Sequence, residues 1–339
     1  MKIFSNILIY LMAIVMTVSS SDSLKTKIGD TAHFGLKVTN DSIVLVNVGY
    51  SEYIDINMVW PNGSVVNATK TATWSTPDPS MVEIGSGRIL GLKKGNAIVT
   101  VSYQGYKKTI GVTTTSDENL ENKYVINNGN VLSTATVSSS TVSQRNAILK
   151  RCSDMLNFHW TPTKDLRSYD AFVFKAGMDQ KGIPYSYTNN LSDSKIFASA
   201  MSYTNFYKNM FINGKSQPSY GSDCSGFVTL AWQLAERYDT VMFLDGIKYG
   251  TFAKVGAYSA YTPNPEDLKK AYAQLLPGDA VVMREDGHGH VYIIAANQVA
   301  GMPGQLFAYE QTPPYCQFTR HTYEDMARKK FMPFKLKKL

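Results

Sequence analysis

The stretch "YGSDCSGFVTL", residues 220–230, contains Cys224, one of only three cysteines in the chain. Ser222 and Asp223 are both residue types that cap helix N-termini, and apolar residues with helical spacing follow them. We therefore expect Cys224 in the first turn of a helix, where unpaired amides and the positive helix end favour a thiolate. Most lone cysteines are buried and structural. A nucleophilic role depends on what else the chain offers this thiol.

The helix that follows is predicted to be amphipathic. Its apolar face is formed by Phe227, Leu230, Ala231, Leu234 and Tyr238. Gly226 is expected to let the helix approach a sheet closely.

A nucleophilic thiol needs a base that accepts its proton. His290 begins the apolar run "HVYIIAA" directly after the turn "REDGHG". A strand-entry position is rigid and open to solvent, as a general base requires. His288 lies two residues earlier, in the turn itself, where histidines are usually plain surface residues. The predicted base is therefore His290.

The base in turn needs a group that orients its other ring nitrogen. The next predicted strand carries Glu310 and Gln311. If His290 faces Thr312 in an antiparallel hairpin, Glu310 shares the face of the histidine. A register slip of one residue would place Gln311 there instead. Glu310 is the favoured third residue, and Gln311 is the alternative.

The region around these residues has an α+β pattern. Residues 143–160 have helical spacing, and residues 194–210 form a second helix candidate within a polar insert, 188–221. Three short β runs follow near the C-terminus, "LLPGDAVVM", "HVYIIAANQ" and "LFAYEQT". These elements predict helices packed on an antiparallel meander.

Four landmarks in this region occur in order: "GIPYSY" (182–187), "DCSGFVTLAW" (223–232), "LLPGDAVVM" (275–283) and "GHVYII" (289–294). Together they resemble the NlpC-like cell-wall cysteine peptidases, which have a papain-like fold. The resemblance covers most of residues 142–339.

The resemblance implies a nucleophile at Cys224, a base at His290 and a third polar residue on the following strand. It also implies that Tyr185 lies near the nucleophile and helps to stabilise the oxyanion. Asp223 and Ser225, which flank the thiol, are assigned with Tyr185 to the oxyanion and substrate side of the site.

The sequence departs from the family pattern in two ways. Between Tyr185 and Cys224 there are 38 residues, far more than the family usually has, so the 188–221 insert could partly cover the substrate groove. The third residue is commonly histidine, whereas this chain offers Glu310 or Gln311. A glutamate there resembles the related CHAP amidases, which leaves open the bond that is cleaved.

The preceding region is predicted to be all-β. Residues 24–113 contain short alternating runs, such as "SIVLVNV", "YIDINMVW" and "NAIVTVSY", separated by turn signals. Residues 72–105 resemble the bacterial Ig-like domain family, which implies a sandwich with a spacer or adhesive role. Residues 114–141 are rich in Ser, Thr and Asn and predict a linker, with a short strand at 124–126 as an option. His33 is isolated and indicates no site.

The chain begins with a segment typical of a signal peptide, residues 1–20, with cleavage near Ser19–Ser21. The expected location is therefore outside the cell, in association with the wall. An odd number of cysteines in an exported chain leaves at least one free. Cys152 and Cys316 could pair or could be ordinary buried thiols.

Composition favours a folded, multidomain protein. Of 339 residues, 44% are hydrophobic and 18% are charged, which excludes a disordered chain. Residues 328–339 carry six basic residues and no acid, against a net charge of +7. This tail could bind acidic wall polymers or be simply solvated. Neither a nucleic-acid motif nor a metal-ligand pattern such as His-Glu-x-x-His is present, so we expect no nucleic-acid partner, no metal and no cofactor. We expect a monomer.

The sequence therefore predicts an Ig-like sandwich followed by a papain-like α+β domain, acting as a secreted cysteine hydrolase on amide bonds of peptidoglycan stem peptides or crosslinks. The alternative is a wall-binding or adhesive protein with an inactive hydrolase-like domain.

Overall fold

The computed structural model describes residues 34–38, 44–48, 51–85, 87–115, 121, 139–169, 172–212, 214–299 and 301–339. The predicted signal peptide, His33, the optional strand at 124–126 and most of the predicted linker lie outside these residues.

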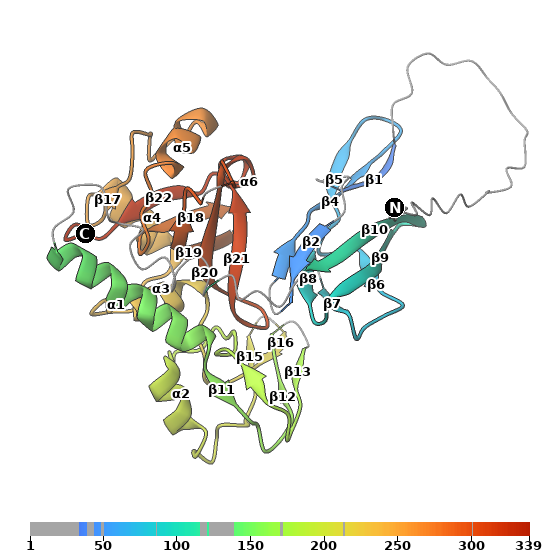
Figure 1. Cartoon of the computed structure of the whole chain (residues 1–339), viewed down its shortest axis with the longest axis horizontal. Coiled ribbons are helices and arrows are strands. Elements are labelled where there is room, and N and C mark those ends of the chain that lie inside the picture. The colour runs from blue at the N-terminus through green and yellow to red at the C-terminus, as the bar shows by residue number, and fades with distance from the viewer. Residues whose placement is uncertain are drawn as a thin grey trace, which may run out of the picture.

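The described part of the chain is a strand-rich mixed α/β protein (Figure 1). As predicted, a β-only region precedes a region that contains helices. The β-only region holds three small groups of strands. They are β1 (Gly35–Val38), β4 (Ile56–Val59) and β5 (Val65–Asn67); β2 (Val44–Asn47), β10 (Tyr106–Thr115), β9 (Gly95–Tyr103) and β6 (Thr73–Ser75); and β3 (Ser51–Tyr53), β8 (Arg88–Gly91) and β7 (Val82–Gly85).

The strands of the β-only region form because apolar residues alternate along them. In β9, for example, Ala97, Val99 and Val101 are buried while the residues between them face outward. Strands β2, β4 and β9 coincide with the three alternating runs that the sequence predicted to be strands.

The C-terminal region contributes six antiparallel strands in the order β17-β22-β18-β19-β20-β21 to a nine-stranded sheet, which continues into β3, β8 and β7 through a parallel bridge between β21 and β3. Its strands are β17 (Ala253–Lys254), β22 (Met332–Lys335), β18 (Ala280–Glu285), β19 (His288–Asn297), β20 (Gln305–Thr312) and β21 (Tyr315–Thr322). The predicted meander is therefore present as β18, β19 and β20. The prediction missed β21 and β22, whose mixed or basic sequences have no clear alternation.

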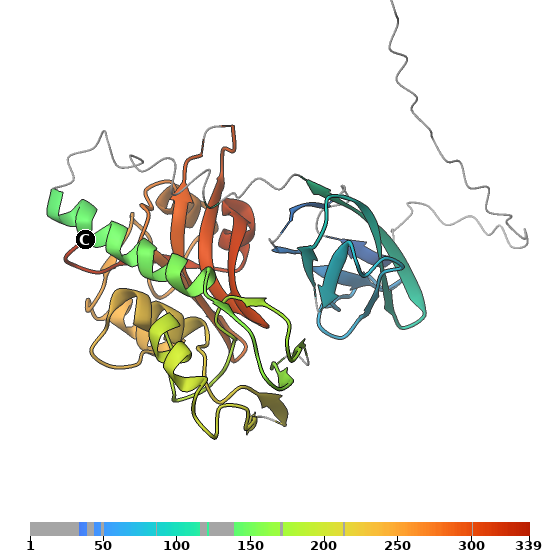
Figure 2. The ribbon, with the colours of Figure 1, turned by 60° about the horizontal axis from the view of Figure 1, so that its bottom comes forward.

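Six helices occur in the described ranges: α1 (Ser139–Leu156), α2 (Ser194–Ala200), α3 (Cys224–Trp232), α4 (Thr240–Lys248), α5 (Pro265–Tyr272) and α6 (Tyr323–Arg328). Helix α3 packs on β19 and β20, α4 packs on β18 and β19, and α1 contacts α3, β20 and β21. Figure 2 shows α1 running along one face of the sheet.

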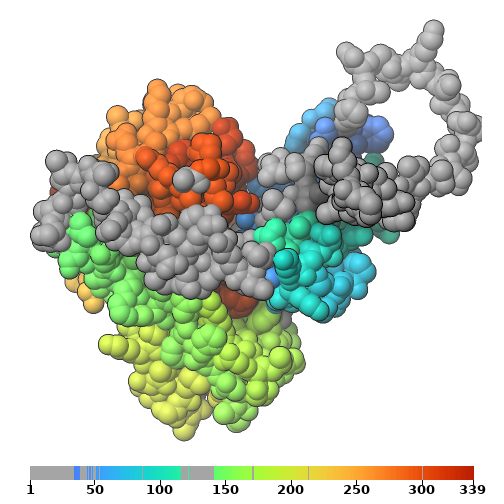
Figure 3. Space-filling model, in the orientation of Figure 1, coloured from blue at the N-terminus to red at the C-terminus, as the bar shows by residue number. Residues whose placement is uncertain are grey.

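Three short strand pairs complete the region: β11 (His159–Trp160) with β14 (Gln180–Lys181), β12 (Leu166–Arg167) with β13 (Val173–Phe174), and β15 (Met210–Ile212) with β16 (Lys215–Gln217). Together with α2 they form the green-to-yellow lobe at the bottom of Figures 1 and 3.

Two helices are shorter than predicted. Helix α3 ends at Trp232 because Gln233 adopts a left-handed conformation with φ of 54°, so Leu234 and Tyr238 lie beyond it. The predicted helix at 194–210 is helical only as α2. Beyond it Phe206 turns inward against Phe197, with ring centroids 5.2 Å apart.

Gly226 has a different role from the one predicted. A Cβ at this position would collide with Leu191 and would crowd the Asp223 carboxylate. It therefore allows the loop that holds Leu191, and not the sheet, to lie close against α3.

The basic C-terminal tail is part of the fold. Phe331, Met332 and Phe334 are buried in or beside β22. Three of its basic residues, Arg328, Lys329 and Lys330, pair with Asp55, Asp325 and Glu285. Half of the six basic residues are thus already engaged with carboxylates of the same chain.

The two regions touch along β21. Thr319 forms a parallel bridge with Ser51, and Arg320 is paired with Glu52 at 3.1 Å. Burial raises the pKa of Glu52 to about 7, although the Arg320 guanidinium opposes this shift. From the segment predicted as a linker, Glu121 buries its carboxylate against the C-terminal region. It accepts hydrogen bonds from Tyr309 at 2.7 Å and Asn157 at 2.8 Å.

A buried ion pair fixes α1 to the sheet. Arg145 of α1 donates to Asp279 Oδ1 at 2.8 Å and to the Pro277 carbonyl at 2.8 Å, and neither side chain of the ion pair is more than 1% exposed. Asp279 also accepts from the Leu276 amide at 2.9 Å. The Pro-Gly-Asp landmark is therefore the turn at the start of β18 to which α1 is bound through Arg145.

Replacing Arg145 by Met should destabilise the protein by about 3–5 kcal/mol, because Asp279 would keep a buried charge without its partner. Urea unfolding at neutral pH measures the change. Lys150→Met is the control, since the Lys150–Asp154 pair on the same helix is exposed and should contribute little. Equal stability of the two variants would contradict this account of the Arg145 pair.

Candidate active site

Cys224 is the first residue of α3, and Asp223 is its N-cap. The backbone of Asp223 is extended, and its Oδ1 accepts the Gly226 amide at 2.6 Å. The structure thus selects Asp223 over Ser222, the other residue that the sequence offered as a cap. This places the thiol at the end of the helix where unpaired amides favour an anion.

The side chains on either side of the thiol hold the helix start in place. Ser225 Oγ donates to Asp223 Oδ1 at 2.9 Å, and Arg237 is paired with Asp223 Oδ2 at 2.7 Å. Both carboxylate oxygens of Asp223 therefore have hydrogen-bond partners, and Asp223 and Ser225 are almost fully buried. The sequence assigned Asp223 and Ser225 to the oxyanion and substrate side. In the structure their side chains are hydrogen-bonded to each other at the cap of α3.

His290 and Glu310 are brought together by neighbouring strands. The β19–β20 ladder pairs Ile293 with Tyr309, which is the register that places Glu310 on the same face as His290. His290 Nε2 lies 2.6 Å from Glu310 Oε2, and the Cys224 thiol lies close enough to the imidazole to help raise the pKa of His290. The sulfur, the imidazole and the carboxylate therefore form a continuous chain across α3, β19 and β20.

This chain of contacts runs from the interior toward solvent. The Glu310 side chain is 3% exposed, whereas that of His290 is 26% exposed. Cys224 is 6% exposed, against 0% for Cys152 and 1% for Cys316. The site therefore opens at the imidazole and is closed behind the carboxylate.

The environment favours charged forms of both partners. Burial by itself would lower the pKa of His290, but hydrogen bonds and charge interactions with Cys224 and Glu310 raise it to about 10. Burial would likewise raise the pKa of Glu310, but His321 and His290 outweigh it and hold that pKa well below its ordinary value of 4.5. Near neutral pH the pair is an imidazolium and a carboxylate.

These pKa shifts make the stability of the fold depend on pH. The raised pKa of His290 means that its protonation stabilises the fold below pH 6.5, and this contribution is lost as the pH rises through about 10. The lowered pKa of Glu310 stabilises the fold above pH 4.5, and this contribution is lost as the pH falls through the folded value.

Gln311, the alternative third residue, lies on the opposite face of β20. Its Nε2 donates to the Ile183 carbonyl at 2.9 Å, and its side chain is fully buried. It makes no contact with His290 among the interactions of the described residues.

Tyr185 lies near Cys224. Its pKa is raised well above 10 by burial, by the nearby Cys224 and by the neighbouring Tyr187. Tyr169 completes a cluster of three tyrosines, with ring centroids 5.1–5.9 Å apart. The family landmark "GIPYSY" pointed to Tyr185 and also contains Tyr187, to which no role was assigned, whereas Tyr169 lies outside every landmark.

Gly289, between His288 and His290, allows α4 to lie close to the start of β19. A Cβ there would collide with Thr240 at the N-terminus of α4. The backbone beside His290 is therefore held by close contact with a helix.

Sequence reasoning also missed His321 on β21, whose Nε2 lies 3.2 Å from Glu310 Oε1. No motif pointed to it. The available signal was its position on a strand next to β20, and that strand was itself not predicted.

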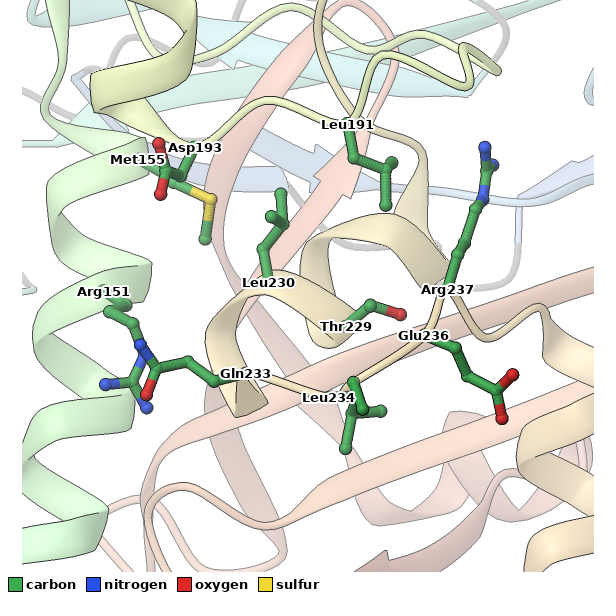
Figure 4. A pocket seen from close by; sticks show the side chains of 11 residues that line it. Arg151, Met155, Leu191, Asp193, Thr229, Leu230, Gln233, Leu234, Glu236 and Arg237 are labelled. Carbon is green, nitrogen blue, oxygen red and sulfur yellow. The ribbon is translucent and has the colours of Figure 1, made fainter.

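A crevice of about 300 Å³ lies at the other end of α3 (Figure 4). Arg151 and Met155 of α1 form one side, and Thr229, Leu230 and residues 233–237 form the other. It is lined by none of the residues Cys224, His290 and Glu310, so it is not the candidate active site. No group of three or more His, Cys, Asp or Glu residues in the described ranges is placed to hold a metal ion. None of the helices described is both long and apolar enough to span a membrane.

No family model matches this sequence, and a search of curated proteins found none similar to it.

Replacing Glu310 by Gln should lower the pKa of His290 below its value of about 10, because a neutral amide stabilises the imidazolium less than a carboxylate does. NMR titration of the His290 ring measures it. Glu324→Gln, which removes a carboxylate that is 78% exposed, is the matched control. An unchanged His290 titration in Glu310→Gln would contradict the described coupling.

The three thiols should differ in reactivity. Iodoacetamide should modify Cys224 in the native protein and leave Cys152 and Cys316 unmodified, because burial raises the pKa of both other thiols. Peptide mass spectrometry identifies the modified residues. Denaturation under reducing conditions should then expose all three. Modification of Cys152 as fast as Cys224 in the native state would show that the burial pattern is wrong.

Proposed function

We propose that this protein is a cysteine hydrolase in which Cys224 is the nucleophile, His290 the base and Glu310 the residue that orients the base. The observation that carries the proposal is the contact chain from the thiol through the imidazole to the buried carboxylate. A thiol at a helix N-terminus, next to a base held by a third group, is the arrangement that nucleophilic catalysis requires.

The first half of the reaction would form an acyl-enzyme. Because Glu310 occupies Nε2 of His290, Nδ1 is the ring nitrogen left for the thiol proton. The Cys224 thiolate attacks the amide carbonyl and forms a C–S bond. The imidazolium then gives its proton to the departing nitrogen as the C–N bond breaks, which releases the amine and leaves a thioester.

The second half would consume one water molecule. His290 takes a proton from water, and the hydroxide adds to the thioester carbonyl. The C–S bond then breaks, which releases the acid and restores the thiolate beside the imidazolium. The sum of both halves is an amide and water converted to an acid and an amine.

Charge on the carbonyl oxygen needs stabilisation, and this is often the largest contribution to catalysis. The backbone amides at the start of α3 are suited to it, since the Asp223 side chain occupies only that of Gly226. Tyr185, next to Cys224, is the side chain best placed to assist.

The substrate proposal rests on the family landmarks. "GIPYSY", "DCSGFVTLAW", "LLPGDAVVM" and "GHVYII" support an NlpC-like, papain-like fold for the C-terminal region, with peptidoglycan stem peptides or crosslinks as the substrate. A helix that carries the thiol and packs on strands that carry the base and third residue is consistent with that fold. We propose an Ig-like role in wall positioning for the β-only region, and action outside the cell.

Cys224→Ala should abolish the release of soluble fragments from purified sacculi, because no other group can form the thioester. Mass spectrometry of the products also identifies the bond cleaved. Cys152→Ala is the matched control, since that thiol is buried in the core away from the site. Circular dichroism verifies that both variants are folded.

Full activity of folded Cys224→Ala would end the nucleophile assignment. If the wild-type protein binds sacculi without releasing any fragment, the alternative of a wall-binding protein with an inactive hydrolase-like region would replace the proposal.

A further inference from the structure

The Glu310 carboxylate has two histidine partners. His290 Nε2 approaches Oε2 at 2.6 Å, and His321 Nε2 approaches Oε1 at 3.2 Å. An ionised carboxylate only accepts hydrogen bonds, so each of these nitrogens carries a proton and donates it. One oxygen is therefore directed at the base, and the other is held by a residue that the proposed reaction does not use.

His321 is itself firmly placed. Its ring stacks on Tyr292, with centroids 4.4 Å apart and planes within 10°. Thr319 Oγ1 lies 3.0 Å from the same Nε2, and the His321 side chain is 15% exposed. Tyr292 lies two residues after His290 on β19 and also contacts its ring, with centroids 5.6 Å apart. Tyr292 therefore packs against both histidines.

We propose that His321 is a positioning residue that holds Glu310 Oε1, so that the carboxylate stays ionised and its Oε2 stays directed at His290. Its effect on turnover rests on the proposed function. Its effect on Glu310 does not, because it follows from the contacts alone.

The surroundings of Glu310 explain why such a residue is needed. The carboxylate is almost fully buried, and an unpaired buried charge would take up a proton. Two titratable groups near Glu310, His290 and His321, donate to it. Two others, Tyr292 and Cys316, have pKa values that are raised mainly by burial. The fifth, Cys224, lies beyond His290. Of these, only the two histidines favour the ionised form of Glu310.

Three variants test the role. His321→Leu removes the donor, His321→Asn keeps a polar group that is too short to reach, and His321→Gln restores an amide N–H near the Nε2 position. In the first two, the pKa of Glu310 should rise, the acid limb of the activity profile should move to higher pH, and kcat should fall roughly tenfold to a hundredfold with KM unchanged. His321→Gln should recover most of this loss.

Two readouts do not depend on the substrate. Carboxyl ¹³C NMR follows the titration of Glu310, and iodoacetamide modification as a function of pH follows the Cys224 thiolate. His159→Gln is the matched control, because His159 also pairs with a carboxylate, Asp179 at 2.7 Å, but at an exposed position. It should change neither readout.

If Glu310 titrates and Cys224 reacts in folded His321→Asn and His321→Leu as in the wild type, the proposal is overturned. It is also overturned if neither variant folds, since His321 would then serve the fold. If the Glu310 titration shifts while the wild-type protein releases nothing from sacculi, the positioning role stands and the proposed function fails.

Discussion

The 2.6 Å hydrogen bond between His290 and Glu310 is the interaction on which the candidate site depends. It requires two strands in one register, because a shift of one residue would turn Glu310 away and present Gln311. It also requires a buried carboxylate to remain ionised, which is unfavourable without partners. The sheet meets the first condition through the β19–β20 ladder, and the second through the two histidines that donate to Glu310.

The thiol reaches this pair because several independent contacts place α3. The Asp223 cap and its Arg237 partner fix the start of the helix, and Gly226 allows the neighbouring loop to approach. On the other side, the buried Arg145–Asp279 pair ties α1 to the start of β18. The Gly226–Leu191 contact and the Arg145–Asp279 pair join segments that are distant along the chain, so the geometry of the site depends on much of the C-terminal region.

Strand β21 connects the site to the rest of the molecule. It lies beside β20, carries His321 toward Glu310, and meets the β-only region through Thr319 and Arg320. Adjacent residues of one strand therefore serve the site and the contact between regions. Because side chains alternate along a strand, Arg320 points to the opposite face from His321.

The sequence by itself determined the local features. The capping residue and the apolar spacing predicted the start of α3 at Cys224, short β runs predicted β18, β19 and β20, and alternation predicted several strands of the β-only region. It named Cys224, His290 and Glu310, but it left Gln311 open because the loop between the strands does not fix their register. Only the tertiary structure decided that register, the end of α3 at Trp232, the choice of Asp223 over Ser222 as the cap, and the place of His321. The physical reason is that a helix cap and an apolar period depend on residues only a few positions apart, so they can be read from the sequence. Strand register and the partners of a buried charge depend on contacts between segments that are far apart in the sequence, and nothing in the sequence of either segment identifies the other.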